Sequence, residues 1–185
     1  MLYKTIFNFA IRIRNALLTR WWNLVGRCLL NIKGIETKGS TSFYGLPIIT
    51  LKPNSKIQLG KFVILCSDSR FTDLGVSRPV ILRTLRPNAL ISIGSDTGLS
   101  GATICAAISV VIGSGCLLGA DVQIFDTDFH KLAPENRCYD NSPELIKCAP
   151  VLIEDNVFIG SGSKVMKGVT IGPNSVIGAC SIVCE

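Results

Sequence analysis

The chain has few residues suited to binding a metal or to forming a disulfide framework. It holds one histidine, and none of its eight cysteines belongs to a CxxC pair. A structural zinc site needs clustered Cys, His or carboxylate ligands at short spacing, so we expect no metal. We also expect no cleavable signal sequence and no disulfides. Most of the cysteines are interpreted as small apolar residues of a narrow core in a reducing cytoplasm.

Acidic residues are absent from positions 1–33, which carry six Lys or Arg. The remaining 13 basic residues (19 minus 6) balance the 13 acidic ones, so the formal charge of +6 belongs to the N-terminal segment. A nucleic-acid-binding protein would be expected to carry a basic stripe with aromatic platforms on its folded body. Here Lys and Arg are scattered over the body, and nucleic acid is not an expected partner.

Apolar residues in this basic segment recur every three or four positions, which predicts an amphipathic helix ending near Gly34. The stripe consists of Ile6, Ala10, Ile13, Leu17, Trp21, Leu24 and Cys28. One hypothesis is that the stripe packs on the body or on a neighbouring subunit. The other places residues 1–33 on an anionic membrane surface, because Trp21, Trp22, Phe7 and Phe9 with six cations suit an interface. Arg and Asn interrupt the apolar stretches, so the helix should not span a bilayer.

Beyond Gly34 the sequence becomes a repeat of short apolar runs separated by Gly, Pro, Asn and Ser. Its clearest register places an aliphatic residue at every sixth position, at Ile153, Ile159, Val165, Ile171, Ile177 and Val183. The same spacing occurs at Ile93, Leu99 and Cys105, and again at Ile112, Leu118 and Ile124. Two inward side chains on a short strand, followed by a turn, would make one side of a triangular coil. The sequence therefore predicts an all-β solenoid of hexapeptide repeats.

We expect two parts in the chain, a basic helix at 1–34 and a solenoid domain at 35–185. Two segments interrupt the predicted coils. The first, 66–90, is rich in Arg, and the second, 126–150, is rich in Asp. Insertions of a solenoid tend to leave from one corner and to form the binding face.

The only histidine, His130, lies early in the second insertion, at the end of the sequence FDTDFH. Neutral imidazole can accept a proton from an alcohol or an amine, which is what a general base must do, although a structural histidine is the alternative. Asp126 or Asp128 could hold the ring by accepting from its other nitrogen, or both could only cap the loop. No GxSxG elbow is present, so direct transfer without a covalent enzyme intermediate is the simpler hypothesis.

The segment IFDTDFH and the run VLIEDNVFIGSGSKVMKGVTIGPNSVIGACSIV resemble the left-handed β-helix acyltransferases of the maltose/galactoside O-acetyltransferase superfamily. The similarity is greatest to polysaccharide-biosynthesis O-acetyltransferases, which share the DTDFH element and the SGATI type of segment at 100–104, and it covers about 45–185. It implies a left-handed parallel β-helix and a homotrimer with active sites between neighbouring prisms. It also implies acetyl-CoA along the cleft, no metal, and His130 as the base.

The resemblance also implies positions for acetyl-CoA. Phe158 takes the place of an aromatic residue that flanks the pantetheine arm. Gly160 lies in the same FIG segment, and Ser161 and Ala179 match positions whose backbone groups hold the arm.

Ser100 and Gly101 match a coil that faces the acceptor in relatives, although each could be a turn residue instead. The C-terminal end departs from the family pattern, because Cys184 and Glu185 stand where Thr and Lys usually occur. Either the sequence is truncated, or another basic residue such as Lys164 or Lys167 replaces the missing contact to the 3′-phosphate of CoA. The alternative is that both lysines are solvated residues of the coil surface.

The function implied is acetyl transfer from acetyl-CoA to a sugar hydroxyl during synthesis of a capsule, O-antigen or exopolysaccharide. The acceptor would be a small or lipid-linked sugar, and the enzyme would be cytoplasmic or peripheral on the inner face of the cell membrane. N-acetylation of a nucleotide-linked amino sugar and acetylation of an antibiotic hydroxyl remain open. A non-catalytic solenoid that serves as an assembly module is an alternative of another class.

Overall fold

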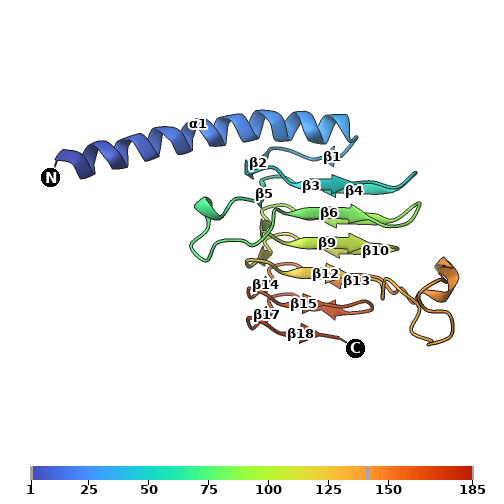
Figure 1. Cartoon of the computed structure of the whole chain (residues 1–185). Helices are drawn as coiled ribbons and strands as arrows, with labels where there is room; N and C mark the ends of the chain where they lie inside the picture. The colour runs from blue at the N-terminus through green and yellow to red at the C-terminus, as the bar shows by residue number, and fades with distance from the viewer. Residues whose placement is uncertain (1, 141, 185) are drawn as a thin grey trace.

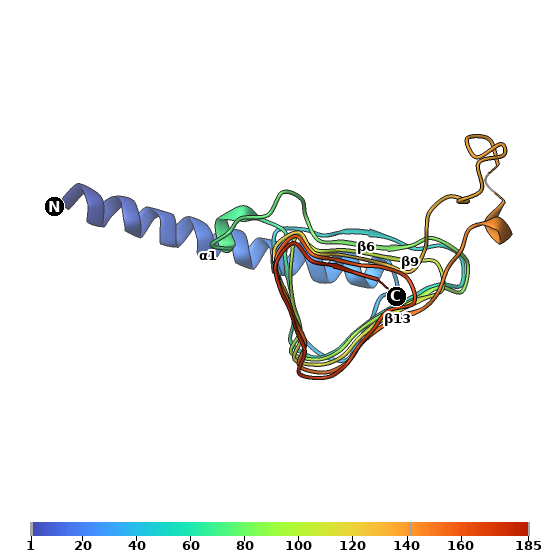
Figure 2. The ribbon, with the colours of Figure 1, turned by 90° about the horizontal axis from the view of Figure 1, so that it is seen from below.

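The computed structural model describes residues 2–140 and 142–184 as a long helix followed by a left-handed parallel β-helix. Helix α1 (Leu2–Ile32) lies across one end of a stack of 18 short strands, and the chain ends at the other end (Figure 1). Seen along the stack, the coils superpose as a triangle (Figure 2). Every third strand belongs to the same sheet, so three parallel six-stranded sheets form the sides of the prism.

Sheet A contains β1 (Glu36–Thr37), β4 (Lys56–Leu59), β7 (Leu90–Ile93), β10 (Ser109–Ile112), β13 (Val151–Ile153) and β16 (Thr170–Ile171). Sheet B contains β2 (Thr41–Tyr44), β5 (Val63–Cys66), β8 (Gly98–Ser100), β11 (Leu117–Leu118), β14 (Phe158–Ile159) and β17 (Val176–Ile177). Sheet C contains β3 (Ile48–Thr50), β6 (Ile81–Thr84), β9 (Thr103–Ala106), β12 (Gln123–Phe125), β15 (Lys164–Val165) and β18 (Ile182–Val183). The corners are named by the sheets that they join.

The six-residue period corresponds to columns of aliphatic side chains inside the prism. Ile112, Ile153 and Ile171 are paired in register along sheet A, and each is at most 5% exposed. Equivalent columns run through Leu118, Ile159 and Ile177 in sheet B and through Ile124, Val165 and Val183 in sheet C. The predicted all-β solenoid is confirmed.

One predicted register is wrong by a residue. In sheet C the column residue that pairs with Ile124 is Ile104, whereas Cys105 pairs with the outward-facing Phe125. The corner before β9 is one residue shorter than the pattern requires and turns at Gly101, whose φ is +57°. The following corner, at Ala107 and Ile108, is longer. The one-residue error in register therefore arises from unequal corner lengths, which the spacing of apolar residues does not reveal.

Helix α1 covers the N-terminal edge of the solenoid. Asn23 pairs with the backbone of the first strand of sheet B, accepting from Phe43 N at 3.2 Å and donating to Phe43 O at 3.4 Å. Gly26 allows the Phe43 ring to lie against the helix backbone, since a Cβ there would be 2.6 Å from the ring. Solenoids need such caps, because an uncovered terminal coil leaves open strand edges and an exposed core.

The helix ends at Ile32, close to Gly34 as the sequence predicts. Gly34 has φ +65°, its N–H donates to Asn31 O, and the N–H of Ile35 donates to Leu30 O at 2.9 Å. Leu30 and Ile35 are both buried, which completes a Schellman cap with its apolar contact. None of the described helices is long and apolar enough to cross a membrane.

The two insertions leave from different corners, not from one corner as expected. The first occupies the B–C corner between β5 and β6 and lies beside α1, whereas the second occupies the C–A corner between β12 and β13 (Figure 2). The first is also shorter than the predicted 66–90, because β6 forms at Ile81–Thr84. Leu82 and Thr84 point into the prism while Arg83 points out, so the arginines that suggested a loop lie on the outside of a strand.

The interpretation of most cysteines as core residues is wrong. Cys66, Cys105 and Cys116 are buried, and burial raises the pKa of each thiol. Cys148 is half-buried, and the four exposed cysteines are Cys28, Cys138, Cys180 and Cys184. Of these, Cys28 lies on α1 and Cys138 lies in the second insertion, so neither could fill the interior of the prism.

A methyl group at a tight corner tests the coil-to-coil spacing. A Cβ at Gly94 would meet the backbone of Gly113 in the next coil, whereas a Cβ at Gly172 would have no atom within 4 Å. We expect Gly94→Ala to lower the free energy of unfolding by about 1–3 kcal/mol, because the backbone of two coils must move apart. Gly172→Ala is the matched control and should leave it nearly unchanged. Equal urea midpoints for the two variants would contradict the close stacking at this corner.

Candidate active site

The second insertion is fixed to the solenoid by Asp126, which is fully buried. Its two carboxylate oxygens accept hydrogen bonds of 2.6 Å from the backbone N–H groups of Ala107 and Ile108 in the preceding coil. Burial raises the pKa of this carboxyl, and the backbone donors oppose that rise. Both oxygens of Asp126 therefore serve the backbone, and Asp126 holds the root of the insertion.

Asp128 has a different environment. Its Oδ1 forms an ion pair of 2.8 Å with Nζ of Lys167, which comes from the next coil. Its Oδ2 is buried and has no hydrogen-bond partner among the described residues. The backbone carbonyl of Asp128 accepts from His130 N at 2.7 Å. Of the two candidate aspartates, Asp128 is the one with an available carboxylate oxygen close in sequence to His130.

His130 is exposed at the surface of the insertion, immediately after a strained residue. Phe129 has φ +61°, a conformation that costs energy for a bulky side chain, and its ring lies 5.4 Å from that of Phe125. The strained backbone at Phe129 sets the direction in which the chain continues to His130. Phe125 is the last residue of β12, so a rigid strand anchors this turn.

The rest of the insertion is held by charged side chains. Arg86, from the same corner of an earlier coil, donates to the carbonyl of Pro143 at 2.6 Å, at the start of the 3₁₀ helix η2 (Pro143–Leu145). Lys131 is 8% exposed and pairs with Asp140 at 2.8 Å. The Lys131 ammonium is the main cause that lowers the pKa of Asp140 to about 2. A pocket of about 250 Å³ lies under the loop, lined by Leu85, Arg86, Ala107, Thr127, Phe129, Pro143 and Ile146.

A second candidate region lies on the outer face of sheet B. Phe158 and Ser100, which the family resemblance relates to acetyl-CoA and to the acceptor, line one groove of about 240 Å³. Leu117 and Phe158 project from its walls, and Gly98, which has no side chain, leaves space between them. The groove is thus apolar, with one hydroxyl at its edge.

Four other predicted residues occupy the B–C corner beside this groove. Ser161 accepts from Cys180 N through its backbone carbonyl, and Gly160 N donates to Ile177 O. A Cβ at Gly160 would lie 2.5 Å from Ala179 N, so the two coils touch here through their backbones. Gly101 lies further along the corner, beneath Val76 and Arg78 of the first insertion. Lys164 is exposed on the outer face of sheet C, near this corner and away from the groove.

His130 and the groove therefore lie on different parts of one chain. The second insertion leaves from the C–A corner, and sheet B is the side of the triangle opposite that corner (Figure 2). The catalytic candidates lie close to one another, and so do the acetyl-CoA-binding candidates, but the two groups are apart in a single chain. Two residues that shape the insertion, Arg86 and the Asp128 partner Lys167, were not predicted in these roles, because they reach it from coils distant in sequence. Glu185, at the expected position of a basic residue, lies outside the described residues.

Comparisons with known proteins agree with the repeat. Residues 150–185 match the family model of the bacterial transferase hexapeptide (six repeats). The C-terminal coils thus carry a transferase hexapeptide repeat. The chain is 38% identical over 83 residues to the galactoside O-acetyltransferase of Lactococcus lactis subsp. lactis, and 38% identical over 86 residues to that of Escherichia coli. These alignments cover 45% of this chain and 38% of the length of each relative. They support a place for the matched segment among the hexapeptide acetyltransferases.

Substitution of Asp126 tests its role as the anchor of the insertion. We expect Asp126→Asn to lower the free energy of unfolding by about 1–3 kcal/mol, because an amide NH₂ would face a backbone donor. Cleavage of the segment 126–150 by trypsin should also become faster. Asp73→Asn, at an exposed carboxylate of the first insertion, is the control and should leave both measurements unchanged. An Asp126→Asn protein as stable and as protease-resistant as the parent would show that the carboxylate is dispensable.

Proposed function

We propose that the protein is an acetyl-CoA-dependent O-acetyltransferase that acts on a sugar hydroxyl of a surface polysaccharide or of its precursor. One observation carries the proposal: the single histidine follows a strained turn at the root of an insertion anchored by Asp126, on a solenoid whose C-terminal coils match transferase hexapeptide repeats. The two acetyltransferases to which the chain is similar act on galactosides by name, which supports a sugar acceptor.

In this proposal His130 is the general base. Its imidazole accepts the proton of the acceptor hydroxyl while the hydroxyl oxygen attacks the thioester carbonyl. The carbon–sulfur bond then breaks, and the imidazolium returns the proton to the departing sulfur, so coenzyme A leaves as the thiol. A backbone N–H or a polar side chain stabilises the developing oxyanion. The proposal needs no metal, and no cluster of three or more His, Cys, Asp or Glu that could hold one occurs among the described residues.

Asp128 is the proposed positioning residue for His130. Both oxygens of Asp126 accept backbone N–H groups, whereas Oδ2 of Asp128 has no partner in the described part of the chain. A buried carboxylate oxygen without a donor is costly, so it favours a conformation in which a donor approaches. The ring N–H of His130 is the proposed donor, and Lys167 holds the carboxylate in place.

The groove on sheet B and the B–C corner fit the pantetheine arm of acetyl-CoA. Phe158 and Leu117 offer apolar walls, and both are about half exposed, at 45% and 56%. At the corner, Gly160, Ser161 and Ala179 present backbone groups without large side chains. Lys164 is the proposed contact to the 3′-phosphate, since Lys167 is already paired with Asp128. Bound acetyl-CoA supplies the activated acetyl group.

We infer that the functional unit is a homotrimer. The insertion that carries His130 projects from the C–A corner, away from the groove of its own chain (Figure 2). An arrangement of parallel prisms would let His130 of one copy face the groove of its neighbour, so each site would need two chains. An enzyme of this kind uses cytoplasmic acetyl-CoA, and lipid-linked saccharides are included among the acceptors because α1 is cationic and partly apolar.

Removal of the imidazole tests the catalytic role. We expect His130→Ala to lower kcat for acetyl transfer to a sugar acceptor by about 10²-fold or more, because the attacking hydroxyl loses its base. Affinity for CoA and the melting temperature should be unchanged, since His130 is exposed and is not among the proposed contacts to the pantetheine arm or the 3′-phosphate. Turnover close to that of the parent protein would overturn this mechanism.

Two further variants separate positioning from ion pairing. Asp128→Asn and Lys167→Met both remove the Asp128–Lys167 ion pair, but only Asp128→Asn removes the carboxylate proposed to orient His130. A larger loss of kcat in Asp128→Asn, with KM little changed, is expected. Equal losses of kcat and of stability in the two variants would assign Asp128 to the ion pair alone.

Calorimetry with CoA tests the groove. We expect Phe158→Ala to weaken CoA binding by about tenfold, in line with the loss of a large apolar contact. Leu152→Ala, at a similarly exposed position on the outer face of sheet A, is the matched control and should bind as the parent does. No detectable CoA binding by the full-length protein would favour a non-catalytic assembly module.

A further inference from the structure

Helix α1 keeps a broad apolar stripe uncovered. Along the part of the helix whose side chains are described, Ile13, Leu17, Trp21 and Leu24 are 45–61% exposed. The N-terminal half of the helix extends well beyond the solenoid, as both views show (Figures 1 and 2), and there Phe7 and Phe9 are exposed as well. Ile6 is also predicted to belong to the stripe, but its side chain lies outside the described part of the structure.

The stripe faces away from the solenoid because the opposite side of the helix makes the contact. Ile13, Leu17 and Trp21 each precede a body-facing residue by nine positions, namely Trp22, Gly26 and Leu30. Nine residues correspond to about two and a half turns, so the members of each pair lie on opposite sides of the helix. The hypothesis that the stripe packs on the body of its own chain is therefore wrong.

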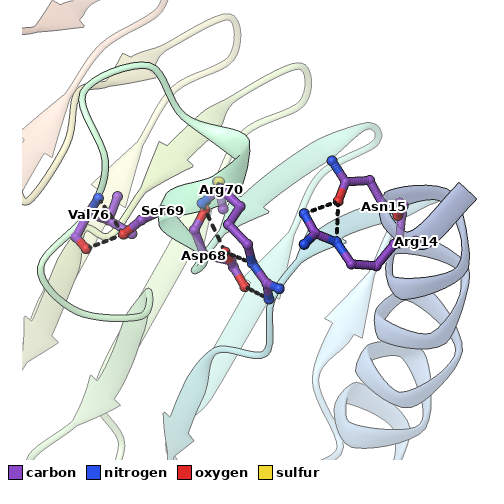
Figure 3. A network of polar contacts seen from close by, with 8 residues as sticks. Arg14, Asn15, Asp68, Ser69, Arg70 and Val76 are labelled. Atoms are coloured by element: carbon purple, nitrogen blue, oxygen red, sulfur yellow. Dashed lines mark hydrogen bonds and ion pairs between the residues drawn. The ribbon is translucent and has the colours of Figure 1, made fainter. Parts of the chain in front are cut away.

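The helix is held so that the stripe cannot turn inward. The Trp22 ring packs edge-on against Phe71 at 5.4 Å, and the Arg70 guanidinium lies 5.6 Å from its centre. Asp68 fixes Arg70 through hydrogen bonds of 2.9 and 2.5 Å (Figure 3), and the Arg70 hydrogen bond lowers the pKa of that carboxyl. The first insertion thus clamps the helix, and the direction of the stripe is a fixed property of the fold.

Cations border the stripe on both sides. Arg14 and Arg20 lie three residues before and after Leu17, which places them about 60° to either side of it, and Arg27 has the same relation to Leu24. All three are exposed, and the sequence of residues 1–35 contains no acid. A basic surface of this kind repels another copy of itself and complements an anionic one. Long arginine side chains can reach a headgroup layer while the stripe enters the acyl boundary.

We propose that the Ile13–Leu17–Trp21–Leu24 face of α1 lies on an anionic lipid surface, with the helix parallel to the membrane and the N-terminal coil of the solenoid toward it. Because α1 lies across the end of the stack, the prism then extends away from the membrane (Figure 1). The partner is the lipid surface itself. The proposal does not depend on the catalytic assignment, and it holds for a protein that binds no CoA.

Flotation of the full-length protein with vesicles tests the proposal. The probes are vesicles of phosphatidylcholine alone and vesicles of phosphatidylcholine and phosphatidylglycerol in equal parts. We expect flotation with the anionic vesicles that weakens as salt is added, because the arginine contribution is screened. The double variant Leu17→Asp, Trp21→Asp should lower partitioning by about tenfold or more. Arg20→Gln and Arg27→Gln should each lower it by about fivefold.

The matched control places the same changes on another exposed surface. Leu132 and Tyr139 of the second insertion are 59% and 88% exposed, and Leu132→Asp, Tyr139→Asp should float as the parent does. Circular dichroism and light scattering on every variant report folding and assembly. The proposal is overturned if the parent does not float, or if the stripe variant floats equally well. If the parent does not float and the stripe variant also changes the oligomeric state, a second copy of the chain covers the stripe in place of lipid.

Discussion

The structure depends on the register between coils, in which one aliphatic side chain stacks on the equivalent residue one turn later. Ile112, Ile153 and Ile171 form such a column, and burial of each contributes on the order of 1.5–3 kcal/mol. The parallel strands that hold the column are only two to four residues long, so no coil is stable alone. Because the columns fix each coil against the next, side chains from distant coils can meet at a corner in a defined geometry.

The second insertion uses this fixed geometry. Asp126 at the end of one coil binds the backbone of the coil before it, and Lys167 in the coil after it binds Asp128. Arg86, from an earlier coil, reaches the far end of the same loop. A loop that begins with the chain's only histidine is thereby tied to three levels of a rigid stack. A general base on a loop requires such contacts, because a loop without them would leave the imidazole poorly positioned.

The fold could be predicted from the sequence wherever the corners have constant length. From Ile153 to Val183 each column residue is six positions from the last, and the structure follows the pattern without a slip. Between Leu99 and Ile112 it does not, because Ile104 is eight positions before Ile112. The longer corner includes Ala107 and Ile108, and their N–H groups are bound by Asp126 of the following coil. Such corners depend on non-local side chains, so apolar spacing cannot locate them. For the same reason Asp126 and Asp128 were indistinguishable in sequence, although one serves the backbone and the other a lysine.

Helix α1 shows a related limit of periodicity. A stripe of large apolar residues predicts one face that avoids water, but it does not identify what covers that face. Here the body binds a second apolar side of the helix, on which Trp22, Leu29 and Leu30 pack against the core. Asn23 adds hydrogen bonds to a strand backbone and Gly26 allows a close contact, neither of which apolar spacing reports. The stripe of Ile13, Leu17, Trp21 and Leu24 is left free and is flanked by arginines. The two sides of the helix thus have different roles. One side caps the strand edges of the solenoid, and the opposite side is the surface that we propose contacts an anionic membrane.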